Sequence, residues 1–334
     1  MKKIAVFTSG GDAPGMNACI RSVVRSSHYF GLEVYGIYRG YDGMINGSFV
    51  EMDDRSVSNI IQKGGTILKS ARSEEFRTKE GRAKAYKNIK EFGIDGLVAI
   101  GGNGTFTGAL LFHEEFGIPC VGAPGTIDND LYGTDFTIGY DTAVNTALSA
   151  IDKIRDTADA HDRIFFIEVM GRDTGYIAVR SAIAGGAEMA LMPETKTSLE
   201  EIITKLKYGT SQSKASHIII VAEGDEIGRA SNIAEQVKRE LPGLDTKVTT
   251  LGHVQRGGAP TAADRVLASR LGLGAVEGLL KGKTNVMAGV INRTLCYTPF
   301  KDTISKKKPI NKELIRMIEV LNGRQYKEAG KETL

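Results

Sequence analysis

Two carboxylates lie two residues apart, a spacing at which both could take part in one reaction. They lie in the segment APGTIDND, where Asp128 and Asp130 point to the same side if the backbone is extended. One such carboxylate can accept a proton from a hydroxyl group, while the other holds Mg²⁺ directly or through water. Phosphoryl transfer requires both tasks. The alternative is an Asx turn with two solvated carboxylates.

Two glycine-rich segments supply backbone amides suited to phosphate groups. TSGGDAPGMNA begins at Thr8 and IGGNGTFTGA begins at Ile100, and each follows or ends a short apolar run. Glycine lets the backbone approach an anion closely, and a following helix adds its positive N-terminal end. We expect the second segment to be a flexible loop that wraps a polyphosphate, with Thr105 donating from its hydroxyl. Neither segment is a Walker A or a G-x-G-x-x-G sequence, so an ordinary glycine turn is the alternative.

Arginines near the ends of predicted elements can bind phosphate oxygens through paired N–H groups. They are Arg72, Arg163, Arg172 and Arg256, and His253 lies three residues before the last of them. Arg21 and Arg25 are four residues apart on one face of a predicted helix, where a bound anion would relieve their repulsion. Taken singly, each arginine is explained as well by a surface ion pair or a solvated helix face.

The elements that must position these groups alternate along the chain. Apolar runs without polar alternation predict strands buried on both faces, as in a parallel sheet covered by helices. In such α/β folds the ligand binds beyond the carboxyl ends of the strands. The predicted strands are residues 3–8, 34–38, 97–100, 120–123, 164–170 and 217–224. The predicted amphipathic helices are residues 18–30, 82–92, 141–154 and 263–280, with another from Asn311 followed by a polar tail that frays.

Length and composition narrow the class of protein. The 334 residues predict about two domains, and 41% hydrophobic and 25% charged residues are typical of a globular protein. A net charge of +3 favours neither nucleic acid nor a membrane surface as partner. The 3 cysteines lack a C-x-x-C pair, and the histidines lack metal-ligand spacing, so we expect neither a disulfide framework nor zinc. Without a signal peptide or a long apolar segment, we expect a cytoplasmic protein.

Six segments together resemble a known family. GGDAPGMNA, GG-x-GT, PGTIDND, MGRDTG, AEG and LGHVQRGG occur in the order and spacing of bacterial ATP-dependent 6-phosphofructokinases, the phosphofructokinase A family, from about Lys2 to the region of Thr298. The resemblance implies two doubly wound, Rossmann-like α/β/α domains in a homotetramer whose active sites are shared between subunits. The larger, ATP-binding domain would comprise residues 1–139 and 253–305. The smaller domain, for fructose 6-phosphate and effectors, would comprise residues 140–252 and 306–334.

The activity implied by this resemblance is transfer of the γ-phosphoryl group of MgATP to the 1-hydroxyl of fructose 6-phosphate, the committed step of glycolysis. Asp128 would take the hydroxyl proton with Thr126 beside it, and Arg172 would stabilise the transferring group. The sugar phosphate would also meet Met170, Gly171, Glu223, His253 and Arg256, with Arg163 and Lys247 reaching in from a neighbouring subunit. The ATP site would comprise Gly11, Tyr41, Arg72, Ser73, Phe76, Gly102, Asn103, Gly104 and Thr105. Mg²⁺ would meet Asn103 and Asp130, and ADP or phosphoenolpyruvate would bind Arg21, Arg25, Arg55, Arg155, Gly186, Glu188 and Lys214.

The chain departs from the family pattern at several positions. Asn103 stands where an aspartate is usual, which predicts weaker Mg²⁺ binding. Lys247 replaces an arginine and loses its paired N–H groups. The effector pocket also differs, which predicts weakened or altered allostery: Gln212 and Ala215 replace basic residues and Asn59 replaces an acidic one.

Two glycines bear on the phosphoryl donor. Pyrophosphate-dependent relatives have an aspartate at the position of Gly104 and a lysine at that of Gly125, so the two glycines favour ATP. A pyrophosphate-dependent enzyme and a catalytically weakened regulatory paralogue remain the alternatives. We expect the lysine-bearing C-terminal extension to be a solvated helix and a frayed tail.

Overall fold

The computed structural model of the chain describes residues 1–160, 163–211 and 216–321. The chain forms two compact units, each built from two segments. Unit 1 comprises Met1–Ala143 and Arg256–Lys308, and unit 2 comprises Val144–Gln255 and the chain from Pro309 onward. Helix α5 (Tyr140–Asp159) begins in the first unit and continues into the second.

Unit 1 contains a seven-stranded sheet in the order β11-β10-β5-β4-β1-β2-β3. All four strands predicted in this unit are confirmed, and they form the parallel centre together with β10. The expectation of a purely parallel sheet is wrong at both edges, where β2 pairs antiparallel with β3 and β10 with β11. The β10–β11 turn explains one edge, because Asn292 and Arg293 both have positive φ angles, as in a tight hairpin. The strands are β1 (Lys3–Thr8), β2 (Glu33–Ile37), β3 (Phe49–Glu51), β4 (Gly96–Gly101), β5 (Cys120–Pro124), β10 (Val286–Ile291) and β11 (Thr294–Pro299).

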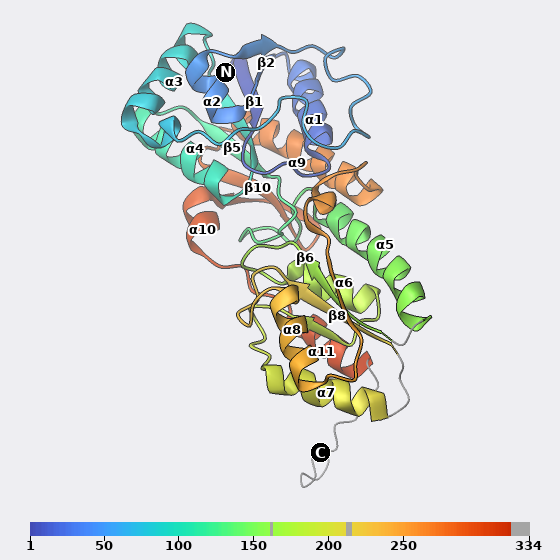
Figure 1. Cartoon of the computed structure of the whole chain (residues 1–334). Helices are drawn as coiled ribbons and strands as arrows, with labels where there is room; N and C mark the ends of the chain where they lie inside the picture. Colours follow the sequence, from blue (N-terminus) through green and yellow to red (C-terminus); the bar gives the residue numbers. More distant parts are fainter. Residues whose placement is uncertain (161–162, 212–215, 322–334) are drawn as a thin grey trace. The chain divides into compact units, whose positions relative to one another are not determined.

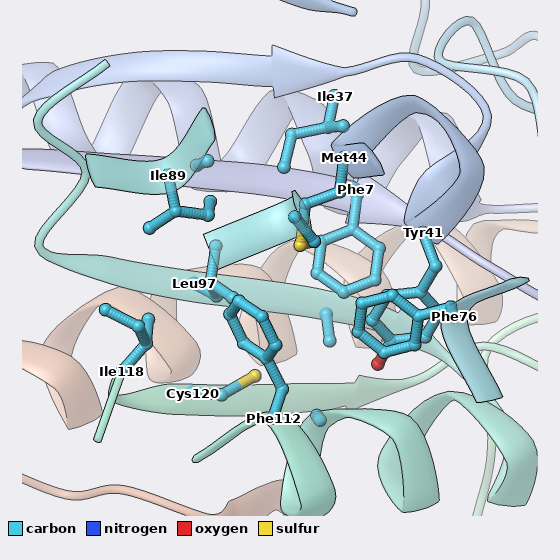
Figure 2. Packing of buried hydrophobic residues seen from close by; sticks show 14 of the residues in the cluster. Phe7, Ile37, Tyr41, Met44, Phe76, Ile89, Leu97, Phe112, Ile118 and Cys120 are labelled. Carbon is cyan, nitrogen blue, oxygen red and sulfur yellow. The ribbon is translucent and has the colours of Figure 1, made fainter. Parts of the chain in front are cut away.

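Helices cover both faces of this sheet (Figure 1). Helices α1 (Met16–Tyr29) and α9 (Ala262–Leu280) pack against each other on one face. Helices α2, α3, α4 and α10 lie on the other face, where alternate residues of β1, Ala5 and Phe7, enter a buried cluster with them. Figure 2 shows this cluster, in which Phe7, Tyr41, Phe76 and Phe112 lie together. The bounds are α2 (Gly40–Asn46), the short 3₁₀ helix η1 (Glu75–Arg77), α3 (Lys79–Glu91), α4 (Asn103–Phe116) and α10 (Phe300–Ser305).

Unit 2 contains a fully parallel four-stranded sheet in the order β7-β8-β6-β9. The predicted strands β6 and β8 are confirmed, and every residue of both is buried. Helices α7 and α8 bury their apolar faces with one side of this sheet, while α6 packs against β8 and α11. The bounds are β6 (Ile164–Val169), α6 (Tyr176–Ala184), β7 (Met189–Leu191), α7 (Leu199–Ser211), β8 (His217–Ala222), α8 (Ala230–Glu240), β9 (Thr246–Thr250), the 3₁₀ helix η2 (Gly252–Arg256) and α11 (Lys312–Leu321).

The chain passes between the units after residues 143, 255 and 308, rather than after the expected 139, 252 and 305. Contacts within each unit explain these shifts. The first turn of α5 stays with unit 1 because Asp264 of α9 accepts hydrogen bonds from the backbone N–H groups of Gly139 and Thr142, both at 2.8 Å. Gln255 stays with unit 2 because its side chain accepts a hydrogen bond from Met170 N.

The four helices predicted for residues 18–30, 82–92, 141–154 and 263–280 are confirmed as α1, α3, α5 and α9. The helix predicted from Asn311 is confirmed as α11, while the tail after Leu321 lies outside the described residues. Within residues 1–160, 163–211 and 216–321, no helix is long and apolar enough to cross a bilayer.

Candidate active site

Three neighbouring parallel strands of unit 1 end beside one another and carry the predicted phosphate-binding segments. Gly10 and Gly11 follow β1, Gly102 follows β4, and Thr126 lies just beyond β5. Hydrogen bonds join the strand ends in turn, from Ser9 N to the Ile100 carbonyl at 3.1 Å and from Gly125 N to the Gly101 carbonyl at 3.0 Å. We call residues 10–12, 102–105 and 126–130 the strand-end cluster. The two glycine segments and the APGTIDND segment therefore lie beyond the carboxyl ends of three adjacent parallel strands, where ligands bind in such folds.

The second glycine segment is a helix rather than the flexible loop we expected. Helix α4 begins at Asn103, with Gly102 as its N-cap and no side chain capping its first turn. The Thr105 hydroxyl donates to the Ser9 carbonyl at 3.1 Å, which ties this turn to β1. Free backbone N–H groups at the first turn of a helix form an anion site without any flexible wrapping.

The side chain of Asn103, in the first turn of α4, contains a buried polar atom without a hydrogen-bond partner among the described residues. Its Oδ1 atom is buried and accepts no hydrogen bond from any residue that the structure describes. A buried amide oxygen without a donor fits ligation of Mg²⁺ or of a metal-bound water, since Mg²⁺ takes few protein ligands and keeps several waters. Across residues 1–160, 163–211 and 216–321, no three His, Cys, Asp or Glu side chains group as a metal site. Asn103 therefore offers one oxygen ligand of the kind that Mg²⁺ accepts.

The carboxylate pair does not have the extended geometry we expected. Strand β5 ends at Pro124, and Asn129, between the two aspartates, has a left-handed backbone with φ of 54°. The alternation that puts residues two apart on one side therefore does not apply. Asp128 is 2% exposed and its backbone N–H donates to the Thr126 hydroxyl at 3.2 Å, whereas Asp130 is half-buried. The two carboxylates thus sit in different environments, which suits different tasks.

Arg256 lies over the first glycine segment. A Cβ atom at Gly11 would lie 2.5 Å from Nη1 of Arg256, and one at Gly64 would overlap the carbonyl oxygen of Gly258. The approach to the Gly258 backbone requires glycine at position 64, whereas the flexible Arg256 side chain can move away from a Cβ at position 11. The Arg256 contact brings the end of LGHVQRGG to the strand-end cluster. His253 belongs to unit 2, so the unit boundary falls between the two residues predicted to hold the sugar 6-phosphate.

The residues predicted for ATP differ in exposure. Tyr41 and Phe76 are core residues, 6% and 4% exposed, with rings stacked at 3.9 Å between centroids (Figure 2). Tyr41 supports the α4 turn, because its hydroxyl donates to the Thr105 carbonyl at 2.5 Å, and burial raises its pKa well above the usual 10.0. Arg72 is exposed, and the Ser73 hydroxyl accepts from Phe76 N at 3.3 Å.

The two glycines that bear on the donor have different surroundings. A Cβ atom at Gly104 would meet no atom within 4 Å, so packing does not require glycine there. A Cβ atom at Gly125 would lie 3.0 Å from Cγ2 of Ile100 and from Cε of Met16, so packing alone restricts that position. Gly104 is therefore the better indicator of the phosphoryl donor, since packing does not explain a glycine there.

A second cluster, in unit 2, holds residues predicted for the sugar. Glu223 follows β8, and its Oε1 accepts from the backbone N–H of Arg172 at 2.8 Å. Gly171 and Arg172 have φ angles of 143° and 52°, and a Cβ at Gly171 would lie 2.6 Å from the Thr174 carbonyl oxygen. Arg172 presents an exposed side chain from this tight turn.

The prediction missed Gln255, which joins two motifs of unit 2. Its buried side chain accepts from Met170 N at 3.4 Å and donates to the Gly252 carbonyl at 3.1 Å. Nothing in the segment LGHVQRGG indicates that its glutamine is buried. In the structure Gln255 is buried, whereas its neighbours His253 and Val254 are exposed.

Arg163 and Lys247, predicted to act across subunits, share one carboxylate. Asp245 accepts from Lys247 Nζ at 2.8 Å and from Arg163 Nε at 2.8 Å. The hydrogen bond from Lys247 and then that from Arg163 hold the pKa of Asp245 below its ordinary value. Strands β6 and β9 bring the two cations together, since Phe165 pairs in register with Lys247.

The predicted effector residues fall in both units. In unit 2, an Nη atom of Arg155 donates to the carbonyls of Gly185 and Gly186, and Glu188 is buried with Oε2 accepting from Ile218 N at 2.6 Å. In unit 1, Arg21 and Arg25 lie on α1 and Arg55 is exposed in the loop after β3. Lys214, Gln212 and Ala215 lie outside the described residues.

Asn17 is a further residue that sequence reasoning missed. It is 1% exposed on α1, donates to the carbonyls of Lys63 and Gly64 at 3.1 Å each, and accepts from Ile67 N at 2.7 Å. Asn17 therefore fixes residues 63–67 beside the first glycine segment. Asn17 precedes the predicted helix of residues 18–30, and only the observed helix, which begins at Met16, includes it.

Comparisons with known proteins agree with this geometry. Residues 3–279 match the family model described as phosphofructokinase. The chain is 75% identical over 327 residues to the ATP-dependent 6-phosphofructokinase of Cytophaga hutchinsonii, covering 98% of this chain and 100% of that protein. It is 56% identical over 321 residues to ATP-dependent 6-phosphofructokinase 1 of Thermus thermophilus, covering 96% and 99%.

Solved structures show the same likeness. A phosphofructokinase structure from Saccharomyces cerevisiae is 37% identical with a TM-score of 0.87, over 96% of this chain and 47% of that one, so our chain spans about half its length. A pyrophosphate-dependent phosphofructokinase from Marinobacter aquaeolei, at 21% identity, has a TM-score of 0.83 over 96% of this chain and 91% of that one, a likeness of fold alone. From its family match, its near full-length relatives and its strand-end cluster, the chain belongs to the phosphofructokinase family.

Proposed function

We propose that this chain transfers the γ-phosphoryl group of ATP to the 1-hydroxyl of fructose 6-phosphate, forming fructose 1,6-bisphosphate and ADP. The names of its near full-length relatives support this activity. The structural observation that carries it is the strand-end cluster, in which glycine backbone, a helix N-terminus and a buried aspartate meet at three adjacent strand ends. Phosphoryl transfer depends mainly on positioning and on neutralising charge, and such a cluster supplies both.

In this proposal the residues of unit 1 hold the nucleotide and remove the proton. The backbone around Gly11 and the first turn of α4 bind phosphate oxygens through N–H groups. Asp128, held by the short turn onto Thr126, accepts the proton of the 1-hydroxyl as that oxygen attacks phosphorus. Its near-complete burial keeps solvent water from competing for the phosphoryl group.

Most residues that bind the sugar and the transferring group belong to unit 2, whereas Arg256 belongs to unit 1. Glu223, next to the Met170–Arg172 turn, accepts hydrogen bonds from sugar hydroxyls, and the exposed guanidinium of Arg172 stabilises charge on the moving phosphoryl group. His253 and Arg256 bind the 6-phosphate. Arg163 and Lys247 act on the substrate of a neighbouring subunit in a homotetramer. To do so they break their ion pairs with Asp245 and bind a phosphate group of that substrate instead.

Magnesium is the metal that this site suits. Asn103, through its buried Oδ1, and Asp130 would hold it together with phosphates of the nucleotide. When bound, the ion would neutralise negative charge on the nucleotide phosphates. Because Asn103 brings no negative charge, we propose a higher Mg²⁺ requirement than an aspartate at this position would confer.

Regulation and location follow from the same family. We place ADP or phosphoenolpyruvate at the Arg155, Gly186 and Glu188 group together with Arg21, Arg25 and Arg55, with altered allostery, and we place the protein in the cytoplasm. Substitution of Arg155 by Met should shift the fructose 6-phosphate saturation curve measured with ADP while leaving the curve without effector unchanged.

One assay tests the proposed function against its alternatives. The purified protein is given fructose 6-phosphate with either MgATP or magnesium pyrophosphate, and fructose 1,6-bisphosphate is measured. Turnover with ATP alone is expected, and turnover with pyrophosphate alone would identify the other donor class. Ligand binding without turnover would support a regulatory paralogue. Asp128→Asn should lower kcat by about 10²- to 10⁴-fold, whereas Asp152→Asn, the same change at an exposed position of α5, should not.

A further inference from the structure

The loop that carries Asp128 is held in place through its next residue, Asn129. Asn129 is 3% exposed and its φ of 54° is a left-handed conformation that asparagine tolerates better than most residues. Its Nδ2 donates to the Asp135 carbonyl at 3.2 Å, and its Oδ1 accepts from Thr137 N at 3.0 Å. The amide thus closes the loop onto its own far side.

A lysine from a distant part of the chain completes this closure. Lys308 Nζ donates to Oδ1 of Asn129 at 3.0 Å and to the Asp135 carbonyl at 2.8 Å. One half-buried ammonium group therefore binds both ends of the turn that follows Asp128. Hydrogen bonds from a charged donor are stronger than those between neutral groups.

The lysine run, which we expected to be part of a solvated extension, is fixed along the same loop. The backbone of Lys307 forms an antiparallel bridge with Leu131, and Lys306 Nζ lies 5.3 Å from the centre of the Tyr132 ring. These residues follow α10, where Phe300 is buried and stacks on Phe106 of α4 at 4.9 Å between ring centroids. Lys308 is thus presented from a rigid base.

We propose that Lys308 is a positioning residue for phosphoryl transfer, acting through Asn129 to hold the Asp128 carboxylate in its reactive place. This inference rests on the proposed function of Asp128 as the base. The hydrogen bonds of Lys308 to Asn129 and to the Asp135 carbonyl are the contacts through which it acts. Because Asn129 and Asp128 are adjacent, any relaxation of the left-handed turn rotates the peptide that carries the base, and small misplacements of a catalytic group have large effects on rate.

Removal of the ammonium group should therefore affect the rate rather than substrate binding. Lys308→Met keeps roughly the length of the side chain and removes the hydrogen-bond donor. We expect kcat to fall by about 10- to 100-fold. The KM values for ATP and for fructose 6-phosphate should change by less than about threefold, since the phosphate-binding backbone belongs to other segments. Lys308→Arg retains a cationic donor and should recover most of the rate.

Two further variants make the test specific. Lys307→Met removes the same charge one residue earlier from an exposed side chain, and it should retain wild-type kcat. Asn129→Gly permits the positive φ but removes the acceptor, and it should lower kcat as Lys308→Met does. The double variant Lys308→Met/Asn129→Gly should be no slower than the slower single variant, because both changes break the same interaction.

The outcomes separate the inference from the proposed function. An inactive wild-type protein refutes the proposed function. If the wild type is active and kcat is unchanged in Lys308→Met, the inference alone is overturned. It is also overturned if, in Lys308→Met, the fall in kcat comes with raised KM values and a lowered melting temperature, because this indicates a general loss of structure. If Lys308→Met does not fold, Asn129→Gly decides: wild-type kcat in that variant overturns the inference, and a reduced kcat at unchanged KM supports it.

Discussion

Replacing Gly104 by aspartate should make the protein more stable and a worse binder of ATP. Gly104 is the second residue of α4, whose first turn contains no acidic residue and no side-chain cap. A Cβ atom there meets nothing within 4 Å, so the aspartate is accommodated without strain. It gains helix propensity over glycine and a favourable interaction with the helix dipole, together about 1 kcal/mol. For a unit of this size that gain raises the melting temperature by about 2–4 °C.

The same carboxylate occupies the place proposed for the nucleotide phosphates. Two unit charges 4 Å apart repel by about 4 kcal/mol at an effective dielectric constant of 20. Because Gly104 is exposed, solvent screening reduces this repulsion by roughly half, to about 2 kcal/mol, which corresponds to an increase of about 30-fold in the KM for ATP.

Steady-state kinetics with varied ATP and thermal unfolding without ligand test both effects in one preparation. Gly104→Asn is the matched control, since it has the shape of aspartate without the charge, and Gly104→Ala isolates helix propensity. The reasoning is refuted if Gly104→Asp leaves the KM for ATP within about twofold of wild type, or if Gly104→Asn raises it equally. A lower melting temperature for Gly104→Asp would refute the account of the helix terminus.

Three other substitutions test separate parts of the account. Asp264→Ala leaves the buried N–H groups of Gly139 and Thr142 without their acceptor, and urea unfolding should show a loss of about 4 kcal/mol. Burial raises the pKa of Asp264 above its ordinary 3.8 despite these hydrogen bonds. The native state therefore binds the proton more tightly than the unfolded state, and the free energy of unfolding falls as the pH rises from the unfolded pKa through the native pKa. The stability of wild type relative to Asp264→Asn should therefore decrease from about pH 4 upward, and an increase would contradict the sign. Asn103→Asp should lower the Mg²⁺ concentration for half-maximal rate by about tenfold, and an unchanged Mg²⁺ dependence would remove Asn103 from the metal site.

Much of the fold was predictable because its signals are local. Strands β1, β4, β5, β6 and β8 are buried apolar runs, and α1, α3, α5 and α9 show helical periodicity, so each element is encoded within its own residues. The short elements β3, β7 and α2 escaped prediction because three to seven residues carry too little pattern. Helix α4 was taken for a loop because glycines disfavour helix locally, whereas Phe106 and Phe112 bury its other face in the core of unit 1.

The candidate site, like the fold, was predictable only in part. The resemblance to phosphofructokinases named Asp128, Arg172, Gly11 and Glu223 by motif, and the structure describes all four. The roles of these residues stay predictions. Arg256 shows the limit of motif reasoning, because nothing in LGHVQRGG indicates that its guanidinium lies over Gly11.

The sequence by itself determined the family, the longer buried strands and amphipathic helices, and the position of glycines and carboxylates after particular strands, because these depend on local patterns. Only the tertiary structure decided which distant residues hold them. Asn129 and Lys308 are 179 positions apart, and Asp264 and Gly139 are 125 apart, yet each pair shares a hydrogen bond. Such contacts depend on how separate elements pack, and a buried polar group takes whichever partner that packing brings within reach.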